Sequence, residues 1–372
     1  MIHSVEELEP HLKGTRILLR SDLNVPIENG TVADPFRLEA ALKTISYLAA
    51  RGARVVLASH MSDKAGSLKP VAEYLKPKLR LTFIEDIAGP AAHAAANALK
   101  DGDVLLLENI RRDNREEAND EGFARELASL GDAYVNDAFP VSHRPHASIV
   151  TVPKLLHAYA GFQFLAEMRG LMPALEPDAP SLAIVGGAKL VTKVGLIHTL
   201  VTKYDKVFVG GALSNDFFAA KGWPVGKSLV SGTDVVGDLL TNPKIVLPET
   251  VTVENPTGTH DVGAHDVGEN DVIWDIAPSS IEALRPLVQE AKFILWNGPM
   301  GNFEKGFTAG TDALAALIAG SHAKSIVGGG DTLSSIQNLH VEDKFTFVST
   351  AGGAMLDFLA NGTLPGIEAL DR

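Results

Sequence analysis

Two lysines follow a pair of glycines at the end of a short apolar run. Residues 182–185 are apolar, the run stops at Gly186-Gly187, and Lys189 and Lys193 come next at helical spacing. Backbone N–H groups without side chains, a helix N-terminus and two ammonium groups on one helix face together suit a polyphosphate. We therefore predict that a buried strand, a glycine loop and a helix together bind a polyphosphate here.

Glycine also follows four further apolar runs in the second half of the chain. The residues after these runs are Gly210-Gly211, Asn297-Gly298-Pro299, Gly328-Gly329-Gly330-Asp331-Thr332 and Ser349-Thr350-Ala351-Gly352-Gly353. Backbone that carries no side chain lets a ligand approach the strand ends closely. The repeated pattern predicts one ligand-binding face built from several strand ends.

Charged and polar residues take the place of glycine after the strands predicted in the first half. They are Arg20, Asp22 and Asn24 after the first strand; Ser59 and His60 after the second; Glu108, Asn109, Arg111 and Arg112 after the third; and Asn136, Asp137, His143, Arg144 and His146 after the fourth. Arg37 stands at the head of the first helix. Arginine forks bind phosphate and carboxylate, so the set predicts a site for a small, highly anionic molecule. Any one of these residues could equally be an ordinary solvated loop residue.

Both groups of residues need a parallel sheet to bring them together. Strand-like runs at 16–19, 54–58, 104–107 and 133–135 alternate with helix-like runs at 35–50, from about 68, and at 121–130. This alternation predicts a mostly parallel sheet covered on both faces, with ligands at the carboxyl ends of its strands. A second such array runs from 181 to about 360, and an amphipathic helix at 161–175 lies between the two.

Bulk composition excludes several classes of protein. The chain has 372 residues, 45% of them hydrophobic and 21% charged, which predicts a globular protein of two domains. A net charge of −13 argues against nucleic acid or a membrane as the main partner. The chain has no cysteine, hence no disulfide or thiolate site. Without a signal-like start or a long apolar run, we expect a soluble, cytoplasmic protein.

One stretch allows two interpretations. The tetrapeptide His-Asp-Val-Gly occurs at 260–263 and again at 265–268. A metal site is the more specific interpretation, but short His/Asp motifs often occur by chance. We favour a solvated excursion between strands.

The order and spacing of these motifs resemble the phosphoglycerate kinases along essentially the whole chain. The matching stretches are RSDLNVP (20–26), SLKPVAEYL (67–75), VLLLENIR (104–111), YVNDAF (134–139), HRPHAS (143–148), GGAK (186–189), WNGPMG (296–301), GGGDT (328–332) and the run 349–354. The resemblance implies an α/β fold of two doubly wound, mostly parallel-sheet domains that face each other across a hinged cleft. It implies a phosphoglycerate-binding domain at 1–160, an interdomain hinge helix at 161–176 and a nucleotide-binding domain at 177–360. A tail of about 361–372 would pack back on the first domain.

The resemblance also implies an activity and its residues. A monomeric enzyme would transfer a phosphoryl group reversibly between 1,3-bisphosphoglycerate and ADP, with Mg²⁺, giving 3-phosphoglycerate and ATP. The implied phosphoglycerate site is Asp22, Asn24, Arg37, His60, Arg111 and Arg144, with Arg20 and His146 beside them. The implied nucleotide site is Gly187, Lys189, Lys193, Gly210, Gly211, Asn297, Pro299, Glu304, Gly329, Gly330, Asp331 and Thr332. Asp331 would also be the metal ligand.

Phosphoryl transfer needs in-line placement and compensation of charge on the transferred group. Arg37, Lys189, Lys193 and the amides of Gly352 and Gly353 are the residues expected to compensate that charge. Substrates on separate domains would require hinge closure, which also excludes water.

The sequence departs from the family pattern at Asp63. The family usually has an arginine there that helps to hold the phosphoglycerate, and Lys64 could replace it only as a point charge. We expect weaker substrate binding as a result. Two alternatives therefore stay open, a catalytically weakened nucleotide-binding relative and a kinase of the same fold for another acyl phosphate.

Overall fold

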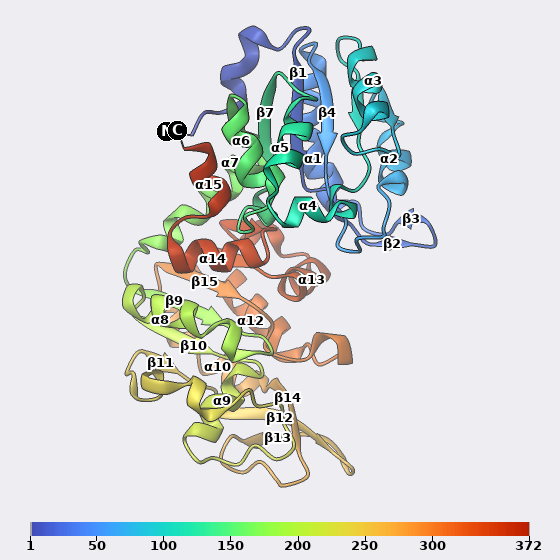
Figure 1. Cartoon of the computed structure of the whole chain (residues 1–372). Helices are drawn as coiled ribbons and strands as arrows, with labels where there is room; N and C mark the ends of the chain where they lie inside the picture. Colours follow the sequence, from blue (N-terminus) through green and yellow to red (C-terminus); the bar gives the residue numbers. More distant parts are fainter. Residues whose placement is uncertain (1, 372) are drawn as a thin grey trace. The chain divides into compact units, whose positions relative to one another are not determined.

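The chain folds into two compact units. The computed structural model describes residues 2–371, apart from the side chains of Thr233 and Asp331. One unit is Met1–Arg169 with Thr363–Arg372, and the other is Gly170–Gly362, coloured from green to red in Figure 1. Among the described residues, no helix combines the length and apolarity needed to cross a membrane.

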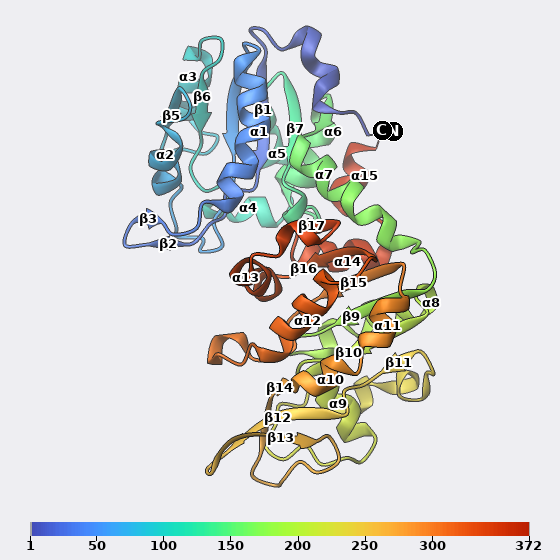
Figure 2. The same ribbon diagram turned by 180° about the vertical axis from the view of Figure 1, so that it is seen from behind.

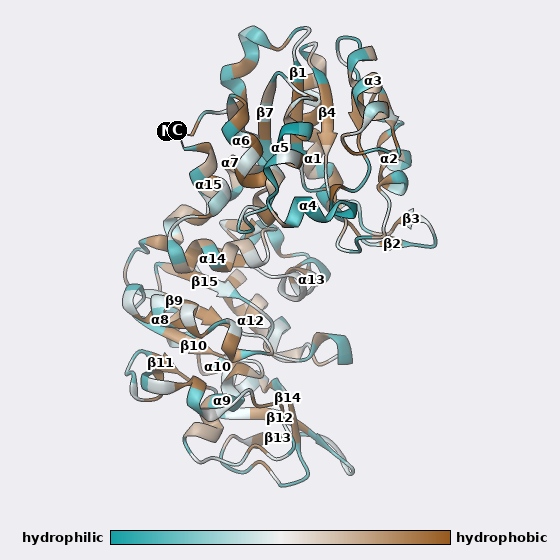
Figure 3. Ribbon diagram, viewed as in Figure 1, coloured by the Kyte–Doolittle hydropathy of each residue, from teal (hydrophilic) through white to brown (hydrophobic). Residues whose placement is uncertain are grey.

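A six-stranded sheet with parallel pairing throughout forms the centre of the first unit. The strand order is β5-β6-β4-β1-β7-β8. The strands are β1 (Arg16–Ser21), β4 (Arg54–Ala58), β5 (Leu81–Phe83), β6 (Val104–Leu106), β7 (Ala133–Asp137) and β8 (Ala158–Ala160). The central strands are mostly apolar and buried on both faces, which Figure 3 shows as brown ribbons inside the unit. Helices must therefore cover both faces of the sheet.

The helices of this unit do so. Figures 1 and 2 show α1 and α5 on opposite faces of the sheet. The helices are α1 (Phe36–Ala50), α2 (Lys69–Leu75), α3 (Pro90–Ala98), α4 (Asn114–Glu117), α5 (Glu121–Ala128), α6 (Val152–Leu155), α7 (Phe162–Leu171) and α15 (Pro365–Leu370), and a small hairpin pairs β2 (Ile27–Glu28) with β3 (Thr31–Val32). Helix α5 begins where the Asp120 carboxylate accepts a hydrogen bond of 2.8 Å from the backbone N–H of Phe123.

The predicted connecting helix is shorter than expected. Helix α7 ends at Leu171, and Met172–Leu175 continues as a 3₁₀ turn. Pro173 lacks the N–H group that a continuing α-helix needs, which accounts for the change. The division between the two units falls inside α7, between Arg169 and Gly170.

The second unit repeats the parallel arrangement. Its sheet has the order β11-β10-β9-β15-β16-β17. The strands are β9 (Ser181–Val185), β10 (Lys206–Val209), β11 (Ile245–Val246), β15 (Phe293–Asn297), β16 (Lys324–Gly328) and β17 (Phe347–Ser349). The helices are α8 (Val194–Lys203), α9 (Leu213–Ala220), α10 (Pro278–Glu282), α11 (Arg285–Glu290), α12 (Ala309–Ala319), α13 (Gly330–Leu339) and α14 (Gly353–Asn361). Helices α8 and α14 pack together on one face, and α12 and α13 on the other (Figures 1 and 2). The predicted fold class, parallel-sheet α/β in both units, is confirmed.

A small antiparallel sheet includes part of the stretch for which the sequence allowed two interpretations. Strand β12 (Thr250–Asn255) pairs with β13 (Gly258–Gly263) and β14 (Val272–Ile276). The first His-Asp-Val-Gly copy is therefore part of strand β13, and the prediction of an excursion between strands is wrong for it. In the second copy, the ring of His265 lies 3.7 Å from that of Trp223, centroid to centroid.

Each parallel sheet changes the direction of its strand order at one point. The change lies between β1 and β7 in the first unit and between β9 and β15 in the second. Connections leave such neighbouring strands in opposite directions, which opens a crevice at their carboxyl ends. The residues after these strands are those that the sequence analysis selected.

Candidate active site

Arg20 and His60 lie at the carboxyl ends of neighbouring strands in the first unit. Arg20 is fully buried, and its guanidinium donates to the Ser21 carbonyl at 2.8 Å, the Ser148 hydroxyl at 2.9 Å and His60 Nδ1 at 3.2 Å. Burial lowers the pKa of His60 well below its ordinary value, and the charges of Arg20 and Arg111 lower it further. His60 is therefore neutral at physiological pH.

Asp22, Asn24 and Arg37 form a second group beside the first. Arg37 Nη1 lies 3.2 Å from Asp22 Oδ2 and donates to the Asn24 carbonyl at 3.3 Å. The Asn24 side chain accepts from the Ser62 backbone N–H and donates to the Ser62 hydroxyl, each at 2.8 Å. Arg37 is half-buried, so most of its donors remain available to a ligand.

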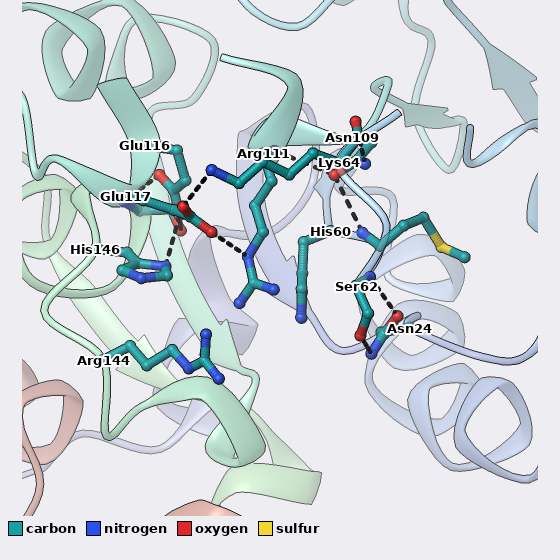
Figure 4. A network of polar contacts seen from close by, with 12 residues as sticks. Asn24, His60, Ser62, Lys64, Asn109, Arg111, Glu116, Glu117, Arg144 and His146 are labelled. Atoms are coloured by element: carbon teal, nitrogen blue, oxygen red, sulfur yellow. Dashed lines mark hydrogen bonds and ion pairs between the residues drawn. The ribbon is translucent and has the colours of Figure 1, made fainter. Parts of the chain in front are cut away.

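Arg111 stands out among these cations because it is buried and its donors are largely unsatisfied within the described residues. Its side chain is 7% exposed, and Nε and Nη2 are buried without a hydrogen-bond partner among the described residues. The nearest carboxylate oxygen, Glu117 Oε1, is 3.6 Å from Nε, and Lys64 Nζ binds the other oxygen of Glu117 at 2.6 Å (Figure 4). Burial lowers the pKa of Arg111, and the positive charges of Arg20 and Arg144 add to that effect. Buried donors without acceptors indicate a place for an anion.

His146 and Arg144 border the same place from the loop after β7. Figure 4 shows the side chains of His60, Arg111 and Arg144 pointing toward one space. His146 is buried, with Nδ1 4.0 Å from Glu116 Oε1, and burial together with the charge of Arg111 lowers its pKa to about 4. Arg144 is exposed to solvent. The structure therefore brings the predicted phosphoglycerate residues together at one end of the first sheet.

Asn109 fixes the loop that carries Asp63. Its amide Oδ1 accepts from the backbone N–H groups of Met61 and Arg111, each at 3.1 Å. Its Nδ2 donates to the carbonyls of Asp63 at 3.1 Å and Gly66 at 3.0 Å. The Asp63 carboxylate accepts from the Ala65 N–H at 3.0 Å, which closes a turn within the loop. The loop is thus held beside the cations by backbone contacts that do not depend on the residue type at 63.

Lys193 lies at the change of strand order in the second unit. Its ammonium donates to the Gly186 carbonyl at 2.7 Å and to Asn297 Oδ1 at 3.1 Å, so it links the ends of β9 and β15. Burial lowers its pKa to about 8. The prediction that Lys189 and Lys193 share one helix face is wrong, because α8 begins at Val194 and a 3₁₀ turn, Leu190–Thr192, separates them. Lys189, before that turn, is exposed to solvent.

Three glycine-containing turns meet so closely that no side chain would fit. A Cβ atom on Gly211 would lie 2.8 Å from the Gly187 nitrogen and 2.9 Å from the Pro299 carbonyl oxygen. Gly187 and Gly211 also have positive φ angles of 122° and 61°. Glycine is required here both for backbone conformation and for close approach.

A cavity of about 460 Å³ opens beside these turns. Four of the predicted nucleotide residues line it, namely Gly187, Gly211, Pro299 and Glu304. Gly210 and Asn297 are buried and directly precede Gly211 and Gly298, Asn297 as the last residue of β15. The wall also includes Trp274 and Asp275 from β14, which the sequence analysis missed because it assigned no strand there.

The remaining predicted residues lie at two helix starts. Gly329, with φ of 112°, precedes α13, whose first residues are Gly330 and Asp331. Thr332 Oγ1 is buried without a partner among the described residues. Gly352, with φ of 56°, precedes α14, which begins at Gly353. The side chain of Asp331, the predicted metal ligand, lies outside the described residues.

Comparison with known proteins decides the family. The family model for phosphoglycerate kinase matches residues 5–362. The chain belongs to the phosphoglycerate kinase family. It is 42% identical to the phosphoglycerate kinase of Moorella thermoacetica, over 99% of this chain and 98% of that protein. With the phosphoglycerate kinase of Roseiflexus sp. it shares 42% identity over 96% of each protein.

Solved structures agree with that result. The phosphoglycerate kinase of Coxiella burnetii matches with a TM-score of 0.85 and 35% identity, over 100% of this chain and 98% of the other. That of Pyrococcus horikoshii OT3 matches with a TM-score of 0.88 and 29% identity, over 99% and 98%. The predicted family, fold and phosphotransferase activity are confirmed, and the two alternatives are not favoured.

Sequence reasoning missed the carboxylates that support the cation cluster. Glu116 is fully buried, accepts from the Ser148 hydroxyl at 2.6 Å and accepts from the Ser148 N–H at 3.0 Å. Glu117 connects Lys64 with Arg111. Two adjacent glutamates in α4 carried no signal by themselves, since acidic pairs are common on solvated helices.

Proposed function

We propose that the chain catalyses the reversible transfer of a phosphoryl group from 1,3-bisphosphoglycerate to ADP, giving 3-phosphoglycerate and ATP. The observation that carries this proposal is the buried Arg111 guanidinium, whose Nε and Nη2 have no acceptor among the described residues. Only an anion compensates such a group fully. 3-Phosphoglycerate provides a phosphate and a carboxylate on a small molecule, which suits a cluster of several cations.

In this proposal the first unit binds the phosphoglycerate. Asp22 and Asn24 bind polar groups of the substrate, and the three arginines Arg37, Arg111 and Arg144 bind its charged ends. The neutral imidazole of His60 donates a hydrogen bond to the substrate, while Arg20 and His146 lie beside the ligand. The low pKa values of His60 and His146 support neutral donors at these two positions.

The second unit binds the nucleotide. The cavity beside Gly187, Gly211 and Pro299 receives the base and ribose, and Glu304 at its rim accepts from the ribose hydroxyls. The phosphates extend toward Lys189, Lys193 and the turn of Gly329, Gly330 and Thr332. The buried hydroxyl of Thr332 supports this placement, because it has no hydrogen-bond partner among the described residues.

Charge compensation is the chemistry that these residues provide. Lys193, Arg37 and the backbone N–H groups of Gly352 and Gly353 stabilise negative charge on the transferred group. A Mg²⁺ ion, held by Asp331 and the nucleotide phosphates, would neutralise further charge, since a carboxylate oxygen is a ligand that this ion prefers. The segment 161–176 acts as a hinge whose closure excludes water. We also propose that the enzyme works as a cytoplasmic monomer.

A coupled assay tests the proposal. Purified protein with 3-phosphoglycerate and MgATP is expected to form ADP in proportion to enzyme, and the reverse direction is expected to form ATP. Absence of turnover from folded protein would contradict the proposal. A second assay with other acyl phosphates, such as acetyl phosphate, separates it from a kinase of different specificity.

Replacing Asp63 by arginine is expected to lower the KM for 3-phosphoglycerate. The substitution removes a carboxylate beside a cation cluster and adds a donor, which changes anion binding by roughly 1–3 kcal/mol, or about 5- to 150-fold. The Asp63 carboxylate accepts from the Ala65 N–H within its own turn, whereas the contacts with Asn109 use the loop backbone and are retained.

Steady-state kinetics measure the effect, with Asp63→Asn as the matched control. The asparagine removes the charge alone and is expected to give part of the improvement. If neither variant changes KM, the loop of Asp63 does not contact the substrate.

A further inference from the structure

Arg20 differs from the other arginines of the cluster in how fully its guanidinium is engaged within the protein. It is 0% exposed, and all three guanidinium nitrogens donate within the protein, to Ser21, Ser148 and His60. Arg111, by contrast, has two nitrogens without a hydrogen-bond partner among the described residues. Arg20 therefore acts on the site through a neighbour.

That neighbour is His60, and the chemistry of the two groups fixes which one donates and which one accepts. A guanidinium has donors and no acceptor, so His60 Nδ1, 3.2 Å from Arg20 Nη2, must present its lone pair. A neutral imidazole then carries its proton on Nε2. We propose that Arg20 is a positioning residue that holds His60 in the Nε2–H tautomer, so that the ring presents a donor to the anionic substrate. This inference rests on the proposed phosphoglycerate site.

The opposite tautomer would harm binding. It would direct the Nε2 lone pair at a phosphate or carboxylate oxygen, so a hydrogen bond would be replaced by repulsion. Protonating both nitrogens would add another charge beside those of Arg20, Arg111 and Arg144, which all disfavour it. A neutral ring with its donor on Nε2 is the state that serves an anion.

A buried relay keeps Arg20 in place. Ser148 Oγ accepts from Arg20 Nε and donates to Glu116 Oε1 at 2.6 Å, while the Ser148 N–H donates to Glu116 Oε2 at 3.0 Å. The Ser148 carbonyl accepts from the Tyr134 hydroxyl at 2.7 Å. Every polar atom of Ser148 is thus engaged, and the Glu116 carboxylate provides the counter-charge for Arg20 through it. The relay runs from α4 to the ends of β1 and β4.

Nitrogen-15 NMR of the whole protein tests the tautomer directly. In histidine-labelled protein at neutral pH, the His60 signals, identified by their loss in His60→Gln, are expected to show a protonated Nε2 and an unprotonated Nδ1. The pattern is expected to persist with 3-phosphoglycerate bound. A protonated Nδ1, or an imidazolium, would overturn the proposal. This readout does not depend on turnover, so it fails or succeeds separately from the proposed function.

Variants link the tautomer to binding. Arg20→Met is expected to mix the two His60 tautomers and to raise the KM for 3-phosphoglycerate about tenfold, with a smaller change in kcat. His60→Gln places an N–H donor near the position of Nε2 and is expected to bind better than His60→Asn, whose amide mimics Nδ1. An unchanged His60 spectrum in folded Arg20→Met would contradict the role of Arg20. Should that variant fail to fold, the spectrum of the unmodified protein still decides whether His60 carries its proton on Nε2.

Discussion

Replacing Lys193 by methionine is expected to lower kcat by about 10²–10³-fold, the usual loss when one preorganised donor to developing charge is removed. The ammonium binds the Gly186 carbonyl and Asn297 Oδ1, and so it fixes a positive charge at the crevice between β9 and β15. Methionine retains the length and apolar stem of the side chain and removes the charge. Single-turnover measurements with MgATP and 3-phosphoglycerate would separate the chemical step from substrate binding.

The pH dependence distinguishes charge from shape at this position. Burial lowers the pKa of Lys193 to about 8, so the free enzyme loses this charge as the pH rises above that value. In the unmodified protein, kcat/KM for MgATP is therefore expected to fall on the alkaline side with a limb near that pKa. In Lys193→Arg the side chain stays charged over the whole pH range of the assay, so the alkaline limb of the profile is expected to disappear.

Lys203→Met serves as the matched control for both experiments. Lys203 is the last residue of α8 and is exposed to solvent, and no proposed ligand contact involves it. Its replacement is expected to leave turnover and the pH profile unchanged. Full turnover in Lys193→Met would refute the assignment of Lys193.

Replacing Arg111 by methionine is expected to abolish most substrate binding and to stabilise the protein. Loss of charged hydrogen bonds to a buried anion weakens binding by about 2–4 kcal/mol, or roughly 30- to 1,000-fold in the KM for 3-phosphoglycerate. In the absence of ligand, Nε and Nη2 of the same guanidinium are buried without a hydrogen-bond acceptor among the described residues, and Arg20 and Arg144 repel it. An apolar side chain of similar size removes this unfavourable desolvation and repulsion, and a gain of about 1–2 kcal/mol in unfolding free energy is expected.

Kinetics and denaturant unfolding together test this pair of opposite effects. Arg115→Met is the comparison, because Arg115 lies four residues further along the chain in α4, is exposed, and pairs with Asp113 and Glu126. That change is expected to leave KM unaltered and stability equal or slightly lower. A destabilised Arg111→Met with unchanged KM would mean that Arg111 is structural.

The parallel sheets could be predicted because their signals are local. The run at 182–185 and its four counterparts are apolar, short and followed by glycine, and burial on both faces leaves few other ways to fold them. The strands β12, β13 and β14 could not be predicted in the same way. Strand β13 is mostly exposed, and its Gly-Thr-His-Asp-Val-Gly sequence has the composition of a loop, so only its pairing with β12 makes it a strand.

The candidate site was predictable as a set of residue types, whereas its internal connections were not. The cations at 20, 37, 111 and 144 follow predicted strands or open a helix, and topology places such residues together. The sequence does not predict the contact between Arg20 and His60 or the ion pair of Lys64 with Glu117, which lies beside Arg111. These depend on side-chain directions in three dimensions. The position of Lys193 was equally unpredictable. Its side chain contacts the ends of β9 and β15 and does not lie on the helix face that the sequence predicted.

The two ends of the chain complete one unit, and this has a consequence for synthesis. Residues Thr363–Arg372 belong with the first unit, where the Gly366 N–H donates to the Ser142 carbonyl at 2.8 Å and Ala369 packs among Ala138, Val141, Ile149 and Val150. Ser142 lies two residues before Arg144, so the tail supports the loop of that arginine. During translation the first unit therefore cannot complete its packing before residues 363–371 have left the ribosome. A chain that stops early, even by one helix, would contain every cation of the anion site and still lack the support of its loop.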